Sequence, residues 1–204
     1  MTKEELKILC VVCLGAFLFF NSIGSINVAV PTIQREFGAS LATIQWVAIM
    51  GVVMISSLSL CFGRAGDILG RRKLYRVGVA LYALGSGLSA LSQSVVQLLI
   101  FRALMTVGLA MAVPLSAAIL ASNFAPERRG QALGWYASAI GIGRATGPTF
   151  AGFLLYLYGW RAIFLMNLVI GFFVSAAVFR VLKGEEERRP ESFEVASERL
   201  EIVG

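Results

Sequence analysis

Two arginines interrupt long runs of uncharged, mostly apolar residues, and they are the side chains best placed for chemistry. Arg102 separates the uncharged runs 77–101 and 103–126, and Arg144 separates 130–143 from 145–160. A guanidinium at the centre of a membrane helix costs about 2.5–3.5 kcal/mol on insertion scales. No Asp or Glu lies in these runs, so each arginine must meet water, backbone carbonyls or groups outside the bundle. We expect both arginines to face a positively charged, water-accessible cavity; a structural pair bonded to carbonyls is the alternative.

The composition argues against other kinds of chemistry. The chain has no histidine, which removes His-dependent catalysis and most zinc sites. Cys10 and Cys13 have the CxxC spacing, but no second pair follows, so buried inert thiols are the simpler interpretation. An intramembrane hydrolase needs a base or a carboxylate dyad within the bilayer. We therefore expect no enzyme activity, no metal and no cofactor.

Long apolar segments must position the two arginines. Of the 204 residues, 57% are hydrophobic and 15% are charged, which leaves too little polar material to cover a water-facing surface. A helix needs about 20 apolar residues to cross about 30 Å of hydrocarbon. The sequence divides into six such segments: 8–30, 41–62, 74–92, 96–121, 131–157 and 162–182. We predict an all-α, polytopic membrane protein with six transmembrane helices.

Lys and Arg are distributed unevenly between the two ends of these segments. With the N-terminus inside, 14 of the 18 fall on the cytoplasmic side, and only Arg35 and Arg161 fall outside. The positive-inside rule then predicts cytoplasmic N- and C-termini in a multi-pass protein of the plasma membrane. The net charge of +6 reports this orientation in the lipid bilayer, and we expect no nucleic-acid partner.

The C-terminal residues differ in composition from the rest of the chain. Residues 185–191 are a run of charges typical of a solvated linker. We expect residues 1–183 to form the six-helix bundle and 184–204 a charged cytoplasmic linker. The last residues regain apolar character, and we expect a missing seventh helix to follow them; a frayed tail is the alternative.

The connection between the second and third segments combines glycines with charges of both signs. Its notable residues are Gly63, Gly66, Asp67, Gly70, Arg71 and Arg72. The glycines permit a tight turn, and Asp67 is placed to cap a neighbouring helix or to pair with arginines, as a clasp that opens and closes. The simpler interpretation is a loop whose basic residues only set orientation.

This connection resembles the inter-helix loop signature of the major facilitator superfamily, and other segments agree with that family in order. The matching segments run from about residue 21 to 171: Asn27–Pro31, Trp46-Val47, Arg102 with Gly108 and Pro114, the antiporter-like residues Gly143, Gly147, Pro148 and Gly152, and Gly159–Gly171. The last is similar to the fourteen-helix drug:proton antiporter branch. Close helix packing alone is the alternative explanation of the glycines around Pro148.

The resemblance implies one six-helix half of a secondary transporter, built from two three-helix repeats. Such a protein exports small molecules or drugs by alternating access, with ion or proton coupling in the complete transporter. The implied partners are a small-molecule substrate and a C-terminal half of six or eight helices, or a second copy. The alternative is a non-transporting scaffold, or a half that works only as a dimer.

The resemblance also assigns residues to roles. The substrate or coupling cavity would include Asn21, Ser22, Asn27, Arg102 and Arg144, and closure of the cytoplasmic side would depend on Gly63, Asp67, Gly70, Arg71 and Arg72. Two positions depart from the branch. Ser22 stands where an aspartate usually carries the proton, nine residues before Pro31, and Met105-Thr106 stands where Gln-Gly usually follows the arginine.

Overall fold

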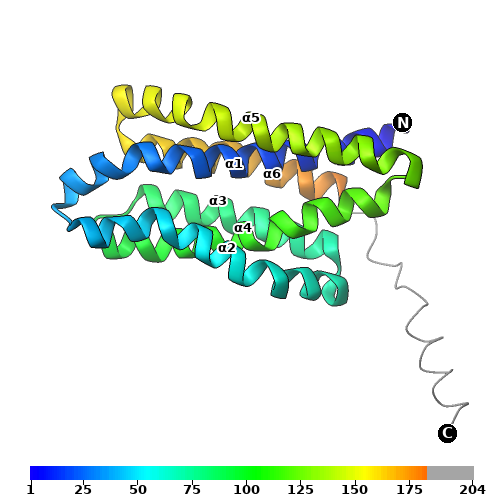
Figure 1. The fold of residues 1–204 in the computed structure, drawn as a ribbon, viewed down its shortest axis with the longest axis horizontal. Coiled ribbons are helices and arrows are strands. Elements are labelled where there is room, and N and C mark those ends of the chain that lie inside the picture. Colours follow the sequence, from blue (N-terminus) through cyan, green and yellow to red (C-terminus); the bar gives the residue numbers. More distant parts are fainter. Residues whose placement is uncertain (183–204) are drawn as a thin grey trace, which may run out of the picture.

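Six long helices make up residues 1–182, the part of the chain that this computed structural model describes (Figure 1). They are α1 (Lys3–Phe37), α2 (Leu41–Leu69), α3 (Arg71–Ala90), α4 (Val95–Asn123), α5 (Pro126–Tyr158) and α6 (Trp160–Val181). Each helix overlaps one predicted segment, so the all-α prediction is confirmed. The predicted linker 184–204 and the helix expected after it lie outside the described residues.

Polar side chains in the sequence determine where several helices begin. Thr2 accepts a hydrogen bond from the Glu5 amide, and Glu5 accepts one in return, which is a capping box at the start of α1. Ser40 and Ser94 cap α2 and α4 in the simpler way, through one side-chain oxygen each. The apolar runs set which residues lie in the membrane, whereas these caps set the helix ends.

The connection between α2 and α3 is shorter than the sequence suggested. We expected a loop from Gly63, but the helix continues to Leu69, and Gly70 alone joins the two helices. Gly70 has a φ of 97°, which a side chain would make costly. The loop prediction was wrong because no residue between Gly63 and Leu69 interrupts the helical hydrogen bonds, which continue up to Gly70. Gly159 makes the same one-residue connection between α5 and α6, with a φ of 79°.

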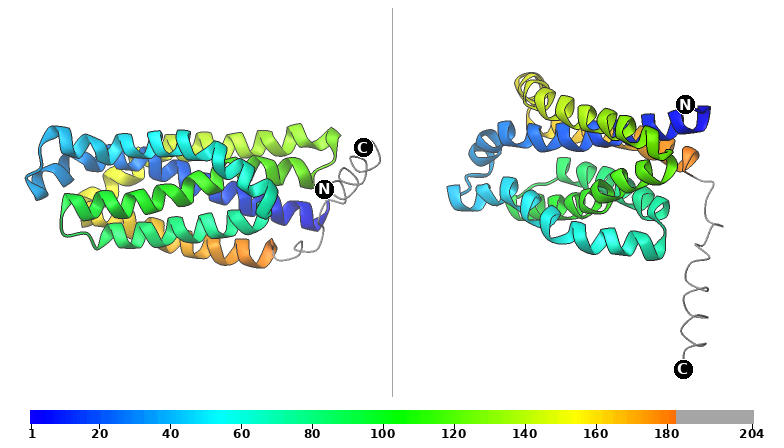
Figure 2. Two further views of the ribbon diagram at one scale, coloured as in Figure 1. Left: turned by 90° about the horizontal axis from the view of Figure 1, so that it is seen from below. Right: turned by 45° about the vertical axis from the view of Figure 1, so that its right-hand side comes forward.

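The arrangement of the helices supports two repeats of three. In Figures 1 and 2, α5, α1 and α6 run along one side of the bundle, and α3, α4 and α2 along the other. The main pairs are α1 with α5, α2 with α4, α3 with α4, α1 with α6, and α3 with α6. When α1, α2 and α3 are exchanged for α4, α5 and α6, the α1–α5 pair corresponds to α2–α4, the α3–α4 pair corresponds to α1–α6, and the α3–α6 pair is unchanged. The two three-helix repeats, α1–α3 and α4–α6, therefore form the same helix pairs, although the α1–α5 contact is more extensive than the α2–α4 contact.

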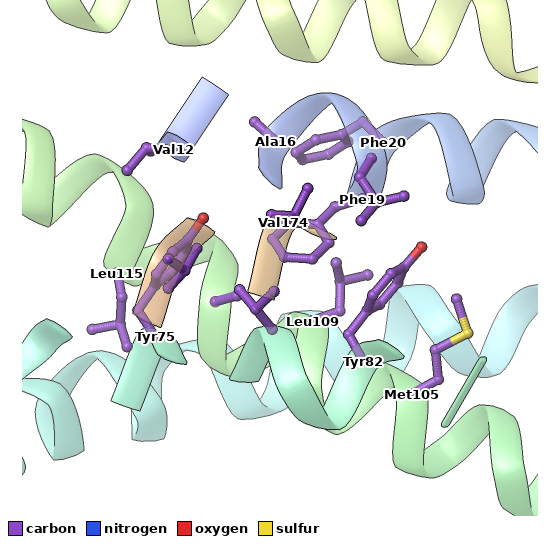
Figure 3. Packing of buried hydrophobic residues seen from close by; sticks show 14 of the residues in the cluster. Val12, Ala16, Phe19, Phe20, Tyr75, Tyr82, Met105, Leu109, Leu115 and Val174 are labelled. Carbon is purple, nitrogen blue, oxygen red and sulfur yellow. The ribbon is translucent and has the colours of Figure 1, made fainter. Parts of the chain in front are cut away.

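The core lies where α1, α3, α4 and α6 meet (Figure 3). The Phe19 and Tyr82 rings pack edge to face, with centroids 5.0 Å apart, and Leu109 and Val174 join the same cluster. Glycine brings α3 and α4 close together, because a Cβ on Gly85 would lie 2.5 Å from the Met105 amide nitrogen. This contact fixes the height of α4, and with it that of Arg102, against the rest of the bundle.

The surface of the bundle suits a lipid environment. Four helices, α1, α2, α4 and α6, are long and apolar enough to cross a membrane by length and composition. The other two, α3 and α5, begin in clusters of basic residues and run beside the first four (Figure 1). Large apolar side chains such as Leu60, Phe153 and Phe172 are exposed. Such a surface is expected to meet lipid or a further protein element.

Candidate functional site

A cavity of about 100 Å³ lies between α1, α2 and α4. Its polar lining consists of Ser22 and Asn27 from α1 and of Arg102 and Thr106 from α4. Apolar side chains complete the wall, and on α2 the small residues Ala48 and Gly51 make room for it. Three of the five predicted cavity residues, Ser22, Asn27 and Arg102, are thus brought together from two helices.

Arg102 is the charged residue of this cavity, and it is deeply placed. Its side chain is 7% exposed, and its Nε has no hydrogen-bond partner among the described residues. The residue lies seven positions after the start of α4 at Val95, about 10 Å along the helix at 1.5 Å per residue. Gly51 of α2 lies opposite, since a Cβ there would be 3.8 Å from the Arg102 Nη2. The glycine therefore leaves the guanidinium open to the cavity.

Ser22 is held in place by the sixth helix. The buried Asn167 of α6 donates a hydrogen bond from Nδ2 to the Ser22 Oγ, at 3.2 Å. Two buried oxygens, the Asn167 Oδ1 and the Tyr82 hydroxyl, have no hydrogen-bond partner within the part of the chain that the structure describes. Buried polar groups without partners are expensive. Their presence beside a hollow is consistent with water entering this part of the bundle.

The other two predicted cavity residues, Asn21 and Arg144, lie outside this lining. Asn21 is buried at the contact between α1 and α5, where its Nδ2 donates to the Thr146 Oγ1 at 3.1 Å. Arg144 is exposed in the bundle, and its guanidinium lies 4.8 Å from the centre of the Phe20 ring. This cation–π contact is worth about 0.5–1 kcal/mol at an exposed site. Whether Arg144 faces a transport cavity stays a prediction.

The antiporter-like residues of α5 hold that helix against α1. A Cβ on Gly143 would lie 2.6 Å from the Phe17 carbonyl oxygen, and one on Gly147 would lie 2.5 Å from the Asn21 carbonyl oxygen. Ser25 joins the two backbones by donating to the carbonyls of both Asn21 and Gly147. Packing thus accounts for these two glycines, whereas a Cβ on Gly152 would meet nothing within 4 Å.

Pro148 adds a local weakness to this tightly packed helix. It has no N–H, so the Arg144 carbonyl four residues earlier loses its helical donor. That carbonyl lies against Gly24, where a Cβ would be 3.2 Å from its oxygen and 3.1 Å from the Pro148 Cδ. The seam between α1 and α5 is therefore close-packed and has one missing hydrogen bond, the combination at which helices bend.

Replacing Gly147 with alanine is expected to destabilise the bundle by about 3 kcal/mol, the upper end of the usual cost of overpacking. The reason is that the new methyl group would collide with backbone rather than with a movable side chain. Circular dichroism during heating in detergent micelles measures the effect. Gly141→Ala is the matched control on the same helix, since nothing lies within 4 Å of its Cβ position. Equal melting temperatures for the two variants would contradict this packing.

The predicted gating residues lie at the junction of α2 and α3. Asp67 and Arg71 form an ion pair one helical turn apart, at 2.8 Å across Gly70. Arg72 donates to the Asn123 side chain of α4. Gly63 faces open space, with nothing within 4 Å of a Cβ. The pairing of Asp67 with an arginine matches one of the two arrangements considered from the sequence; its gating role stays a prediction.

At the opposite end of the bundle lies a cluster that sequence reasoning missed, made by Glu36, Ser92, Trp160 and Arg161. The Glu36 carboxylate at the end of α1 accepts hydrogen bonds from Trp160 Nε1, at 2.6 Å, and from Arg161. Arg161 also donates to the Ser92 carbonyl between α3 and α4, and its guanidinium stacks 4.3 Å from the Trp160 ring. The cluster therefore ties α1 and α6 to the α3–α4 turn.

The charges of this cluster make its strength depend on pH. The hydrogen bond from Arg161 lowers the pKa of the Glu36 carboxyl below its usual value, against the opposing effect of partial burial, and Trp160 lowers it further. A carboxyl whose pKa is lower in the folded state stabilises the fold above its unfolded pKa. That contribution is lost as the pH falls through the folded pKa.

Trp160→Phe is expected to destabilise the bundle by about 1–2 kcal/mol, because it removes a hydrogen bond to a charged acceptor. Thermal unfolding followed by circular dichroism at pH 7 tests this. Trp46→Phe is the control, since Trp46 is 56% exposed. The melting temperature of the unmodified protein should fall below about pH 5, partly because Glu36 becomes protonated. The Glu36→Gln variant has no carboxyl at this position, so its melting temperature should fall less over the same pH range. An unaltered acid profile in that variant would count against the cluster.

Some of these residues had a signal in the sequence and some did not. Glu36 and Arg161 carry opposite charges at the same predicted end of the bundle, so their pairing could have been predicted from the sequence. Thr106 was noted only as a departure from the family pattern. Gly51 and Asn167 gave no sign of their neighbours, because contacts between distant helices depend on rotation about each helix axis.

The chain has clear relatives among characterised proteins. Residues 12–203 match the sequence profile of the Major Facilitator Superfamily. The chain is 30% identical over 169 residues to the riboflavin transporter RibZ of Clostridioides difficile, covering 83% of this chain and 37% of RibZ. It is 32% identical over 210 residues to the multidrug resistance protein Stp of Mycobacterium tuberculosis, covering 100% of this chain and 38% of Stp.

A third relative is the tetracenomycin C resistance and export protein of Streptomyces glaucescens. It is 31% identical over 189 residues, covering 92% of this chain and 35% of that protein. The chain thus spans less than two fifths of the length of these three relatives.

Solved structures show the same fold. A bacterial homologue of the human lysosomal transporter Spinster, inward-facing and occupied, superposes with a TM-score of 0.79 at 20% identity, over 93% of this chain and 46% of that one. A D-xylose–proton symporter gives a TM-score of 0.76 at 17% identity, over 97% of this chain and 52% of that one. About half of each structure therefore corresponds to this bundle.

The six-helix bundle, its apolar surface and its buried charged cavity define a half-unit of a multi-pass membrane transporter fold. The chain belongs to the Major Facilitator Superfamily. This family consists of transporters for small molecules rather than enzymes, as the riboflavin transporter and the tetracenomycin C export protein among the relatives illustrate.

Proposed function

We propose that this chain is the N-terminal half of a secondary transporter that exports small molecules by alternating access. The observation that carries the proposal is the buried guanidinium of Arg102, which has no ion-pair partner among residues 1–182, in a cavity shared by α1, α2 and α4. A charge in a membrane helix is tolerable where water or a ligand reaches it. The relatives named for multidrug resistance and tetracenomycin C export favour efflux of drug-like compounds; riboflavin is the cargo in another relative's name.

The proposed orientation has the N-terminus and the ends of α2, α4 and α6 in the cytoplasm. In Figure 1 the N-terminus lies at the same end of the bundle as the α2–α3 and α4–α5 connections. That end carries the basic residues Arg71, Arg72, Lys73, Arg128 and Arg129. The excess of positive charge supports a cytoplasmic position for it. The five acidic side chains of residues 1–182 all lie at helix ends. The carboxylates for ion or proton coupling would therefore come from outside the described residues.

A second set of helices is expected to complete the transport path. The chain matches about half of the structures that share its fold, and the exposed faces of α2 and α5 carry large apolar residues. We propose a C-terminal half of six or eight helices, or a second copy, as the partner. A scaffold without transport activity is the competing function.

Flux through reconstituted vesicles tests the proposal. The assembled protein, with its second half or second copy, is placed in proteoliposomes and offered ethidium, riboflavin or tetracenomycin C. Accumulation of at least one of the three above protein-free vesicles, driven by an imposed proton or sodium gradient, is the expected result. Rates equal to those of protein-free vesicles for all three under both gradients would favour the scaffold.

A further inference from the structure

The charges around the cavity do not balance. Its lining contains one charged side chain, Arg102, and three neutral polar ones, Ser22, Asn27 and Thr106. The acidic residues among the described positions are Glu4, Glu5, Glu36, Asp67 and Glu127. They lie in the first turns of α1 and α5, at the end of α1 and near the end of α2. The cavity therefore carries a formal charge of +1 within this bundle.

The neighbours of Arg102 do not satisfy its guanidinium. No ion pair joins it to another described residue, and its Nε is buried without a partner. The group stays protonated in proteins and presents five N–H donors in a rigid fork. Burying such a group without an acceptor is costly. A ligand acceptor in the cavity would remove that cost, and an anionic one would remove most of it.

We propose that Arg102 determines specificity by binding an anionic group, such as a carboxylate, on the transported compound. This inference rests on the proposed transport function and adds the charge class of the cargo. A carboxylate matches the guanidinium fork with two parallel hydrogen bonds. Gly51 leaves the approach open on the α2 side, since a side chain there would meet the Arg102 Nη2. The apolar wall of Ile23, Ile26, Val52 and Leu109 suits the remainder of an amphipathic molecule.

Ser22 is a second position at which the charge of the cavity can be changed while Arg102 is kept. It lines the same cavity, and Asn167 fixes its side chain. An aspartate at this position would supply the missing negative charge from within the bundle. Ser22→Asp should therefore neutralise the cavity and abolish selection for anions even though Arg102 is intact. Ser22→Asn has nearly the same shape without the charge, so the two variants separate charge from size.

Three probes of one shape test the proposal: 4-fluorobenzoate, 4-fluorobenzamide and 4-fluorobenzamidinium. Their binding to the purified, assembled protein in detergent is measured by fluorine NMR at pH 7. We expect the benzoate to bind at least tenfold more tightly than the amide, and the amidinium more weakly still. Arg102→Gln and Ser22→Asp should each reduce benzoate binding at least tenfold. Ser22→Asn should reduce it less, and Arg35→Gln, an exposed charge at the end of α1, should leave it unchanged.

Other outcomes overturn the proposal. Equal affinity for the three probes, preference for the amidinium, or no binding of the benzoate would each show that Arg102 does not select an anion. Equal losses in Ser22→Asp and Ser22→Asn would show that size, not charge, is responsible. The proteoliposome flux experiment tests the transport function independently of this binding experiment. If the protein selects benzoate but shows no flux, the proposed transport function is contradicted and this inference is not. If flux is observed without benzoate selectivity, this inference is contradicted and the transport function is not.

Discussion

Arg102→Ala is expected to lower the transport rate at least tenfold while the protein still inserts and accumulates in the membrane. The physical reason is that a hydrogen bond involving a charged group is worth about 1.5–3 kcal/mol, and Arg102 is the charged residue lining the cavity. Insertion should not suffer, because alanine removes a cost of about 2.5–3.5 kcal/mol at mid-membrane. Flux in proteoliposomes, divided by the amount of incorporated protein, is the measurement.

Arg102→Lys tests the role of the guanidinium fork. Lysine keeps the charge but cannot form two parallel hydrogen bonds with one carboxylate, so an intermediate rate is expected. Arg35→Gln, at the exposed end of α1, should transport at the unmodified rate. A normal rate in Arg102→Ala would remove the residue from the transport cycle.

Asp67→Asn is expected to reduce transport to the background rate without loss of expression. The ion pair between Asp67 and Arg71 is exposed on both sides, and such pairs contribute only about 0–1 kcal/mol to stability. Folding should therefore tolerate the change. A role in closing the cytoplasmic side would be lost, because the neutral amide no longer holds Arg71 across the one-residue turn at Gly70. Arg64→Gln, which removes a nearby exposed charge, should transport normally.

Gly63→Leu tests the same junction through shape. The bundle offers open space at this position, so leucine should not disturb the fold described above. Transport should still fall to background if a second set of helices approaches α2 here, because the branched side chain would block that approach. Gly63→Ala should be much milder. Normal transport in both Asp67→Asn and Gly63→Leu would remove the gating role from this segment.

The sequence contained enough to predict the six helices and their order. Charges are absent from the apolar segments except at a few positions, so helix existence follows from hydropathy and length. The position of Arg102 within the fourth segment also predicted a buried charge, and the structure places it 7% exposed in a cavity. These features depend on local composition, which a single sequence displays directly.

The rotation of each helix was harder to predict. Asn21 and Ser22 are neighbours in the sequence, yet Asn21 contacts Thr146 of α5 and Ser22 contacts Asn167 of α6. A step of about 100° per residue separates them, and only the packing of glycines such as Gly147 against α1 determines which of the two faces the cavity. The end of α2 was mispredicted for a related reason. Gly63 and Gly66 were interpreted as turn residues, but both lie within the helix. Gly63 faces open space, and Gly66 packs closely against the Leu115 side chain.

The central claim is that water and charged solutes reach the Arg102 cavity, and cysteine accessibility tests it most directly. In a background with the three native cysteines replaced by alanine, Thr106→Cys places a thiol in the cavity wall. Ile100→Cys places one on the exposed apolar side of the same helix. Membrane-embedded protein is treated with the anionic reagent sulfonatoethyl methanethiosulfonate, and modification is read by mass. The account predicts modification of the Thr106→Cys variant and little or none of the Ile100→Cys variant; an inert thiol in the first beside a reactive thiol in the second would contradict it.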